Sequence, residues 1–103
     1  MTKLKITVVK TFTNEEVFGD KFPEDVENAN NRCRKYHPGQ IFILEDIACP
    51  KGFCAWAFAD IFREIRHLML GGNFPWIGKP GVAFASCTDG KKPVIFKLER
   101  VEE

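Results

Sequence analysis

Residues 55–70, AWAFADIFREIRHLML, carry the strongest structural signal in the chain. When each residue advances about 100° around a helix, the large apolar side chains fall on one arc of about 120°. These side chains are Phe58, Ile61, Phe62, Ile65, Leu68 and Met69. The glycines at 71–72 then end the helix, because glycine adopts the left-handed cap conformation without a Cβ clash. The pattern predicts one amphipathic helix with Phe58, Phe62 and Ile65 in the core.

Strand patterns flank this helix on both sides in the sequence. Residues 3–12 alternate apolar and polar side chains, which predicts a half-buried strand. Residues 41–44, IFIL, are apolar on both faces and predict a strand that is central or covered on both sides. Residues 82–88 and 93–101 predict two further strands. The Asp-Gly step at 89–90 between them is typical of a hairpin turn.

This order of elements predicts an α+β fold, a small four-stranded, mostly antiparallel, curled sheet with one main helix at about 55–70. A partly closed barrel is an alternative form of the same sheet. The 103 residues are interpreted as a single domain. Residues 13–31 are rich in Asp and Glu and predict an acidic surface excursion, with a short helix around residues 24–30. We interpret this excursion as a solvated insert rather than a docking surface for a basic partner.

Charge and hydropathy exclude several functional classes. The chain has 15 Lys and Arg against 14 Asp and Glu, a formal net charge of +1, and a dedicated nucleic-acid binder usually has a basic excess. No apolar run approaches the roughly 18 residues that a membrane span needs. Residues 1–15 lack the apolar segment of a secretory signal. We therefore expect a cytoplasmic protein that binds neither nucleic acid nor membrane.

Four cysteines, Cys33, Cys49, Cys54 and Cys87, are the first candidates for chemistry. In a reducing compartment cysteines serve as metal ligands, catalytic groups or buried thiols more often than as disulfides. Cys33, His37, Cys54 and Cys87 together provide the ligand set of a Cys₃His zinc site. Two alternatives remain open. Either the thiols are inert and buried, or Cys54, at the start of the predicted helix, is a reactive thiolate stabilised by the helix N-terminus.

Aromatic residues give a second group of candidates. Trp56, Asp60 and His67 lie on the polar face of the predicted helix, and Trp76 lies in the Pro- and Gly-rich loop that follows. We expect both tryptophans to be substantially buried, either by this loop or by a neighbouring subunit. Simple packing of the loop on the helix explains the pattern. A ligand pocket or an oligomer interface formed by these four residues is the alternative.

Three segments resemble the pattern of a family of small, uncharacterised bacterial and archaeal proteins. They are GFCAWAFADI at 52–61, GGNFPW at 71–76 and CTDGKKPVIFKLER at 87–100. The resemblance covers most of the chain from Cys33 onward, together with the KITVVKTF opening. It implies no particular activity, because no activity is established for the family.

The family pattern also contains a cysteine, a following histidine and a glycine before the second strand, which Cys33, His37 and Gly39 match. The chain departs from the pattern at Ala55, where the family usually has proline. Cys49 has no counterpart in the pattern. The resemblance therefore implies that Cys49 lies outside any site that the family shares.

These observations lead to three hypotheses about function. The first is a small binding or accessory protein, with a small molecule or a protein as partner, whose Cys/His cluster binds zinc. The second is a thiol-dependent enzyme or redox protein that uses Cys54. The third is a structural or oligomeric module, a homo-oligomer for example, with inert thiols.

Overall fold

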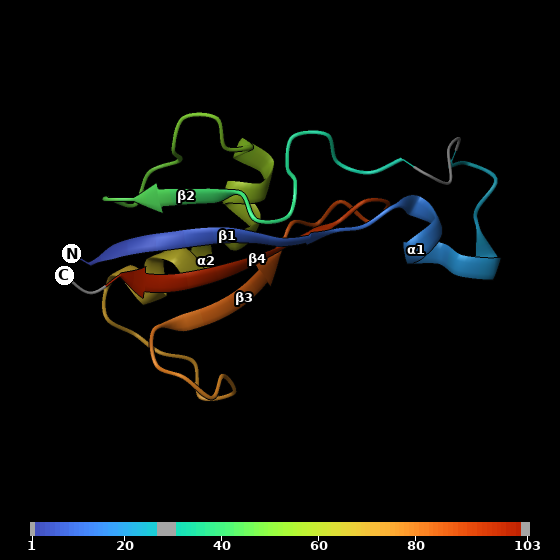
Figure 1. The fold of residues 1–103 in the computed structure, drawn as a ribbon. Helices are drawn as coiled ribbons and strands as arrows, with labels where there is room; N and C mark the ends of the chain where they lie inside the picture. The colour runs from blue at the N-terminus through green and yellow to red at the C-terminus, as the bar shows by residue number, and fades with distance from the viewer. Residues whose placement is uncertain (1, 27–30, 102–103) are drawn as a thin grey trace.

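The computed structural model describes residues 2–26 and 31–101, and it has an antiparallel four-stranded sheet with the strand order β2-β1-β4-β3 (Figure 1). The strands are β1 (Lys3–Thr11), β2 (Ile41–Leu44), β3 (Val82–Ser86) and β4 (Val94–Val101). The helices are α1 (Asn14–Phe18), the 3₁₀ turn η1 (Gly19–Lys21) and α2 (Ala55–Met69). The predicted α+β fold is confirmed. The sheet is open, with β2 and β3 at its edges, so the barrel alternative is not formed.

Alternation along β1 determines which face of the sheet becomes the core. Leu4, Ile6 and Val8 are buried on one face, as predicted. Opposite Ile6 lie Phe42 of β2 and Leu98 of β4, so the same face continues across the sheet. The α2 helix packs against this face (Figure 1). None of the helices in the described part of the chain is long and apolar enough to cross a membrane.

The buried side of α2 agrees with the predicted arc at Ile61, Ile65, Leu68 and Met69 and differs from it at the two phenylalanines. Its fully buried residues are Ala57, Ile61, Ile65, Leu68 and Met69. Phe62 is 38% exposed, so its assignment to the core is wrong. Phe58 is only half-buried and pairs with Phe62, with ring centroids 5.7 Å apart. The reason is that the buried stripe is centred between Ile61 and Ile65, and Phe62 lies about 80° around the helix from that centre, beyond its edge.

The prediction for residues 41–44 is also wrong in part. They form a strand, but β2 is an edge strand, and Ile41 and Ile43 are 51% and 50% exposed. Only the face that carries Phe42 and Leu44 packs on the hydrophobic core, with Phe42 against Tyr36 and Phe53. No described helix lies over the opposite face, so the second set of apolar side chains faces solvent.

The acidic segment contains a helix where none was predicted. The α1 helix begins after Thr13, whose side chain accepts a hydrogen bond from the N–H of Glu16, while the Glu16 carboxylate accepts the N–H of Thr13. This reciprocal arrangement is a capping box, and the sequence Thr-x-x-Glu is its recognisable signal. Of the helix predicted around residues 24–30, residues 24–26 are not helical. Residues 27–30 lie outside the described residues.

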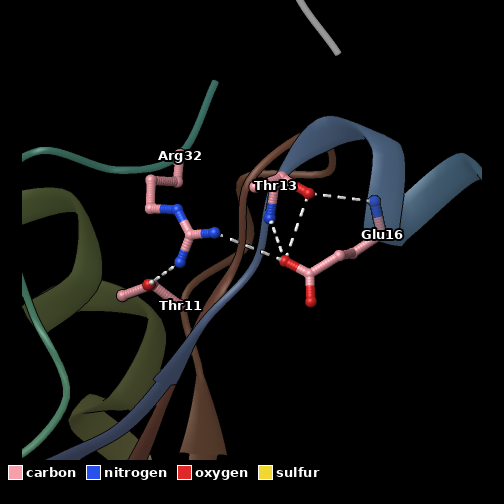
Figure 2. A network of polar contacts seen from close by, with 4 residues as sticks. All are labelled: Thr11, Thr13, Glu16 and Arg32. Atoms are coloured by element: carbon pink, nitrogen blue, oxygen red, sulfur yellow. Dashed lines mark hydrogen bonds and ion pairs between the residues drawn. The ribbon is translucent and has the colours of Figure 1, made fainter. Parts of the chain in front are cut away.

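Arg32 connects the returning chain to the end of β1. Figure 2 shows its guanidinium between the Thr11 hydroxyl, 3.3 Å away, and the Glu16 carboxylate, 3.8 Å away. The backbone N–H of Asn14 also donates to the carbonyl of Asn31. These contacts fix the chain immediately before Cys33, which is the first residue of the candidate site.

Candidate functional site

A cavity of about 480 Å³ lies at the N-terminal end of α2. Three separate segments line it: the loop before β2 through Cys33 and Tyr36, the start of α2, and the connection between β3 and β4 at residues 87–92. Its lining is mainly apolar. A volume of a few hundred cubic ångströms with an apolar lining and few polar groups is typical of small-molecule sites.

Three of the four predicted site residues meet at this cavity. Cys33, Cys54 and Cys87 all line it, whereas Cys49 is exposed and lies outside its lining. All four cysteines, Cys49 included, are free thiols. His37 is exposed in a turn, where its backbone N–H donates to the side chain of Gln40, and it does not line the cavity.

The meeting of three cysteines at the cavity does not by itself form a zinc site. Within residues 2–26 and 31–101, no group of three or more His, Cys, Asp or Glu side chains is arranged to hold a metal ion. The Cys₃His assignment stays a prediction. Elemental analysis of protein purified without chelator tests it.

Tyr36 is a site residue that the sequence analysis missed. Its side chain is only 5% exposed and its ring packs against Phe42, Phe53 and Phe96. The hydroxyl accepts a hydrogen bond from the backbone N–H of Cys54, at 2.7 Å. Burial raises the pKa of Tyr36 well above its ordinary value, and the nearby thiols raise it further, although the Cys54 hydrogen bond acts in the opposite direction. The phenol therefore keeps its proton.

The N-terminus of α2 opens on the cavity without a side-chain cap. Cys54 occupies the N-cap position, and its side chain makes no capping hydrogen bond. The first helical bond runs from the N–H of Phe58 to the carbonyl of Cys54, at 2.9 Å. The N–H groups of the three preceding residues, 55–57, have no acceptor in the described part of the protein. Unpaired N–H groups of this kind attract anions and acceptor atoms.

Thr88 joins the rim of the cavity to α2. Its hydroxyl accepts a hydrogen bond from Trp56 Nε1–H, at 3.0 Å, and donates to the Asp60 carboxylate, at 3.0 Å. The Thr88 N–H also donates to Asp60, at 2.7 Å. On the same loop, the sulfur of Cys87 accepts the N–H of Val94, at 3.3 Å. Asp60 thus fastens the β3–β4 connection to α2, which holds the cavity wall in place.

The four aromatic and polar candidates do not form one site. Trp56 and Asp60 are at the cavity rim, whereas His67 lies in the last turn of α2 and contacts the Asn73 carbonyl, at 2.9 Å. The Trp76 ring lies against Phe74 at an interplanar angle of 43°, and Phe74 in turn packs on His67.

Neither tryptophan is buried within the chain. Trp56 is 67% exposed and Trp76 is 76% exposed, so the prediction that the loop covers them is wrong. The loop folds back on His67 through Phe74 rather than on Trp56, which is about three helical turns away. Cover by a neighbouring subunit stays a prediction.

The fold and the cavity together define a small α+β protein with a ligand-sized cavity at a helix N-terminus. No protein-family model, no curated protein and no solved structure matches the chain.

Proposed function

We propose that this protein binds a small, mainly apolar molecule in the cavity at the N-terminus of α2. The observation that carries the proposal is the cavity itself, about 480 Å³ in volume and bounded by segments far apart in the chain. Burying apolar ligand surface is favourable by roughly 25 cal/mol per Å² before the costs of association are subtracted. A cavity of this size accommodates a ligand large enough for micromolar affinity.

The rigidity of the walls supports the same proposal. Tyr36 is held by four aromatic and backbone contacts, and the opposite wall is fastened through Thr88 and Asp60. A site with walls held in this way loses little conformational entropy on binding, which favours affinity.

The experiment uses N-phenyl-1-naphthylamine, a neutral apolar probe whose fluorescence rises on leaving water. We expect saturable binding to the wild-type protein. Cys33→Phe places a large ring into the half-buried lining and should weaken binding about tenfold or more. Cys49→Phe is the matched control, because Cys49 is exposed outside the cavity, and it should leave binding unchanged. Equal affinities for the two variants would contradict the proposal.

Protection of the cavity thiols from alkylation is an independent test for a ligand in the same site. Saturating octan-1-ol should slow alkylation of Cys33, Cys54 and Cys87 by iodoacetamide, measured residue by residue by mass spectrometry. Cys49 serves as an internal control whose alkylation rate should not change. Protection of all four thiols, or of none, would count against a ligand in this cavity.

A thiol-dependent activity is the second candidate, and one observation favours it. Cys54 lies at the uncapped N-terminus of α2, with its thiol lining the cavity. This is the arrangement in which helix N–H groups stabilise a thiolate. Alkylation of Cys54 in the free protein at least as fast as that of exposed Cys49 would support it. Slower alkylation of Cys54 would leave simple ligand binding as the better account.

A further inference from the structure

We propose that the ligand is an apolar molecule with a carboxylate group, and that the carboxylate binds between the Tyr36 hydroxyl and the N-terminus of α2. This inference rests on the proposed function, because it names the chemical class of ligand for the same cavity. Three observations carry it: a buried donor, an uncapped helix end and two unpaired ammonium groups at the rim.

The buried donor is the O–H group of Tyr36. Its oxygen accepts the Cys54 N–H, at 2.7 Å, but its own proton has no acceptor among residues 2–26 and 31–101. Tyr36 is only 5% exposed, and it lines the cavity. A buried donor without an acceptor costs free energy, which a ligand oxygen at this position would recover.

The uncapped helix end adds donors beside Tyr36. The 15-residue α2 helix directs the N–H groups of its first turn toward its N-terminal end, where Cys54, Trp56 and Ala57 line the cavity. The helix dipole places partial positive charge at the same end, which favours an anion over a neutral acceptor. The Asp60 carboxylate, on the second turn of α2, accepts hydrogen bonds from the N–H and the hydroxyl of Thr88.

Two lysines supply positive charge at the rim of the cavity. Lys91 and Lys92 line it together with Asp89, and Asp60 lies beside it through its hydrogen bonds to Thr88. One oxygen of Asp89 accepts the backbone N–H groups of both lysines, at 2.9 and 3.3 Å. Neither ammonium group forms an ion pair in the described part of the chain. Two unpaired ammonium groups at the rim favour an anionic group of the ligand over a neutral one.

The first experiment compares octanoate with octan-1-ol by isothermal titration calorimetry. The two probes have the same chain and differ in the head group. We expect octanoate to bind about tenfold tighter or more, the gain typical of hydrogen bonds to a charged group. Equal or tighter binding of the alcohol would overturn the inference and leave the proposed function standing. If neither probe nor N-phenyl-1-naphthylamine binds, the proposed function itself fails.

The second experiment locates the head group. Tyr36→Phe removes the donor and should weaken octanoate about tenfold while changing octan-1-ol little. Because this variant also removes the acceptor for the Cys54 N–H, its thermal midpoint must be measured beside its affinity.

A variant with altered charge tests the same carboxylate site if Tyr36→Phe folds poorly. Lys91→Gln/Lys92→Gln should weaken octanoate and reduce the salt dependence of its affinity, with octan-1-ol unchanged. Lys21→Gln/Lys79→Gln is the matched control, since both lysines are exposed and outside the cavity. Full octanoate preference in both the Tyr36 and the Lys91/Lys92 variants would overturn the inference.

Discussion

At the scale of single residues, the hydrogen bond from Cys54 N–H to Tyr36 organises the site. It joins the loop before β2 to the start of α2, although the two residues are 18 positions apart in the chain. It also provides an acceptor for the backbone N–H of Cys54, the N-cap residue of α2. The same hydroxyl therefore has a structural role through its oxygen and a proposed binding role through its proton.

The structural role predicts a measurable loss of stability. Tyr36→Phe leaves the Cys54 N–H without its partner in a largely buried setting, which should lower the free energy of unfolding by about 1–3 kcal/mol. Urea unfolding followed by circular dichroism measures the change. An unaltered midpoint would mean that water replaces the hydroxyl without cost, and the bond would then have no structural role.

A second residue-scale prediction concerns Glu16. The hydrogen bond from the Thr13 N–H (Figure 2) lowers the pKa of Glu16 below the ordinary 4.5, with further lowering from the Thr13 hydroxyl and from the charges of Lys10 and Arg32. A carboxyl group whose folded pKa is depressed stabilises the fold above its unfolded pKa. That contribution is lost as the pH falls through the folded pKa.

Glu16→Gln removes this titration while a glutamine still completes a capping box. We therefore expect the thermal midpoint of the variant to fall less than that of wild type between neutral pH and about pH 3. Glu15→Gln, on the same helix but outside this network, is the control. A wild-type acid dependence in the Glu16 variant would show that the network does not affect stability.

At the scale of elements, α2 divides its residues between two tasks. One stripe packs on the sheet, and its N-terminal end bounds the cavity. The buried stripe is about as wide as the apolar arc but is rotated by about 20° from it, so Ala57 is buried and Phe62 is exposed. Packing on a twisted sheet, rather than side-chain size, decides which residues are buried.

This division predicts unequal costs for two truncations on the same helix. Ile65→Ala should lower the free energy of unfolding by about 2–5 kcal/mol, because Ile65 is fully buried. Phe62→Ala should cost about 1 kcal/mol or less, since its ring is partly solvated and packs mainly on Phe58. Chemical denaturation of the two variants in parallel decides the point. Equal losses of unfolding free energy in the two variants would mean that Phe62 belongs to the core.

The sequence predicts regular elements well because their periodicity is local. The alternation of β1 and the apolar arc of α2 are visible in neighbouring residues. Residues 41–44 show the limit: apolar side chains on both faces are the same pattern for a central strand and for an edge strand with one uncovered face. Only the tertiary arrangement of β2 separates these possibilities.

The candidate site is predicted less completely, for the same reason. Cysteine is a chemically distinctive residue, so Cys33, Cys54 and Cys87 are apparent from the sequence alone. Tyr36 and Thr88 act through contacts with residues 18 and 28 positions away, and no local pattern encodes those distances. Thr13 and Glu16 are different, because their capping-box spacing was present in the sequence and was overlooked.

At the scale of the whole molecule, the cavity depends on the complete fold. The loop before β2, the start of α2 and the β3–β4 connection meet only when the sheet is assembled (Figure 1). Since the unfolded chain cannot gather these segments, a ligand of the cavity binds the folded state alone. Binding must then raise the apparent stability of the whole protein.

The most direct test of the central claim is an amide-resolved NMR titration of the wild-type protein with octanoate. The account predicts the largest shifts at the N–H groups of residues 54–57 and 87–92, with little change on the face of the sheet that carries Ile41 and Ile43. Saturable shifts confined to that sheet face, or unshifted amides at residues 54–57, would contradict it.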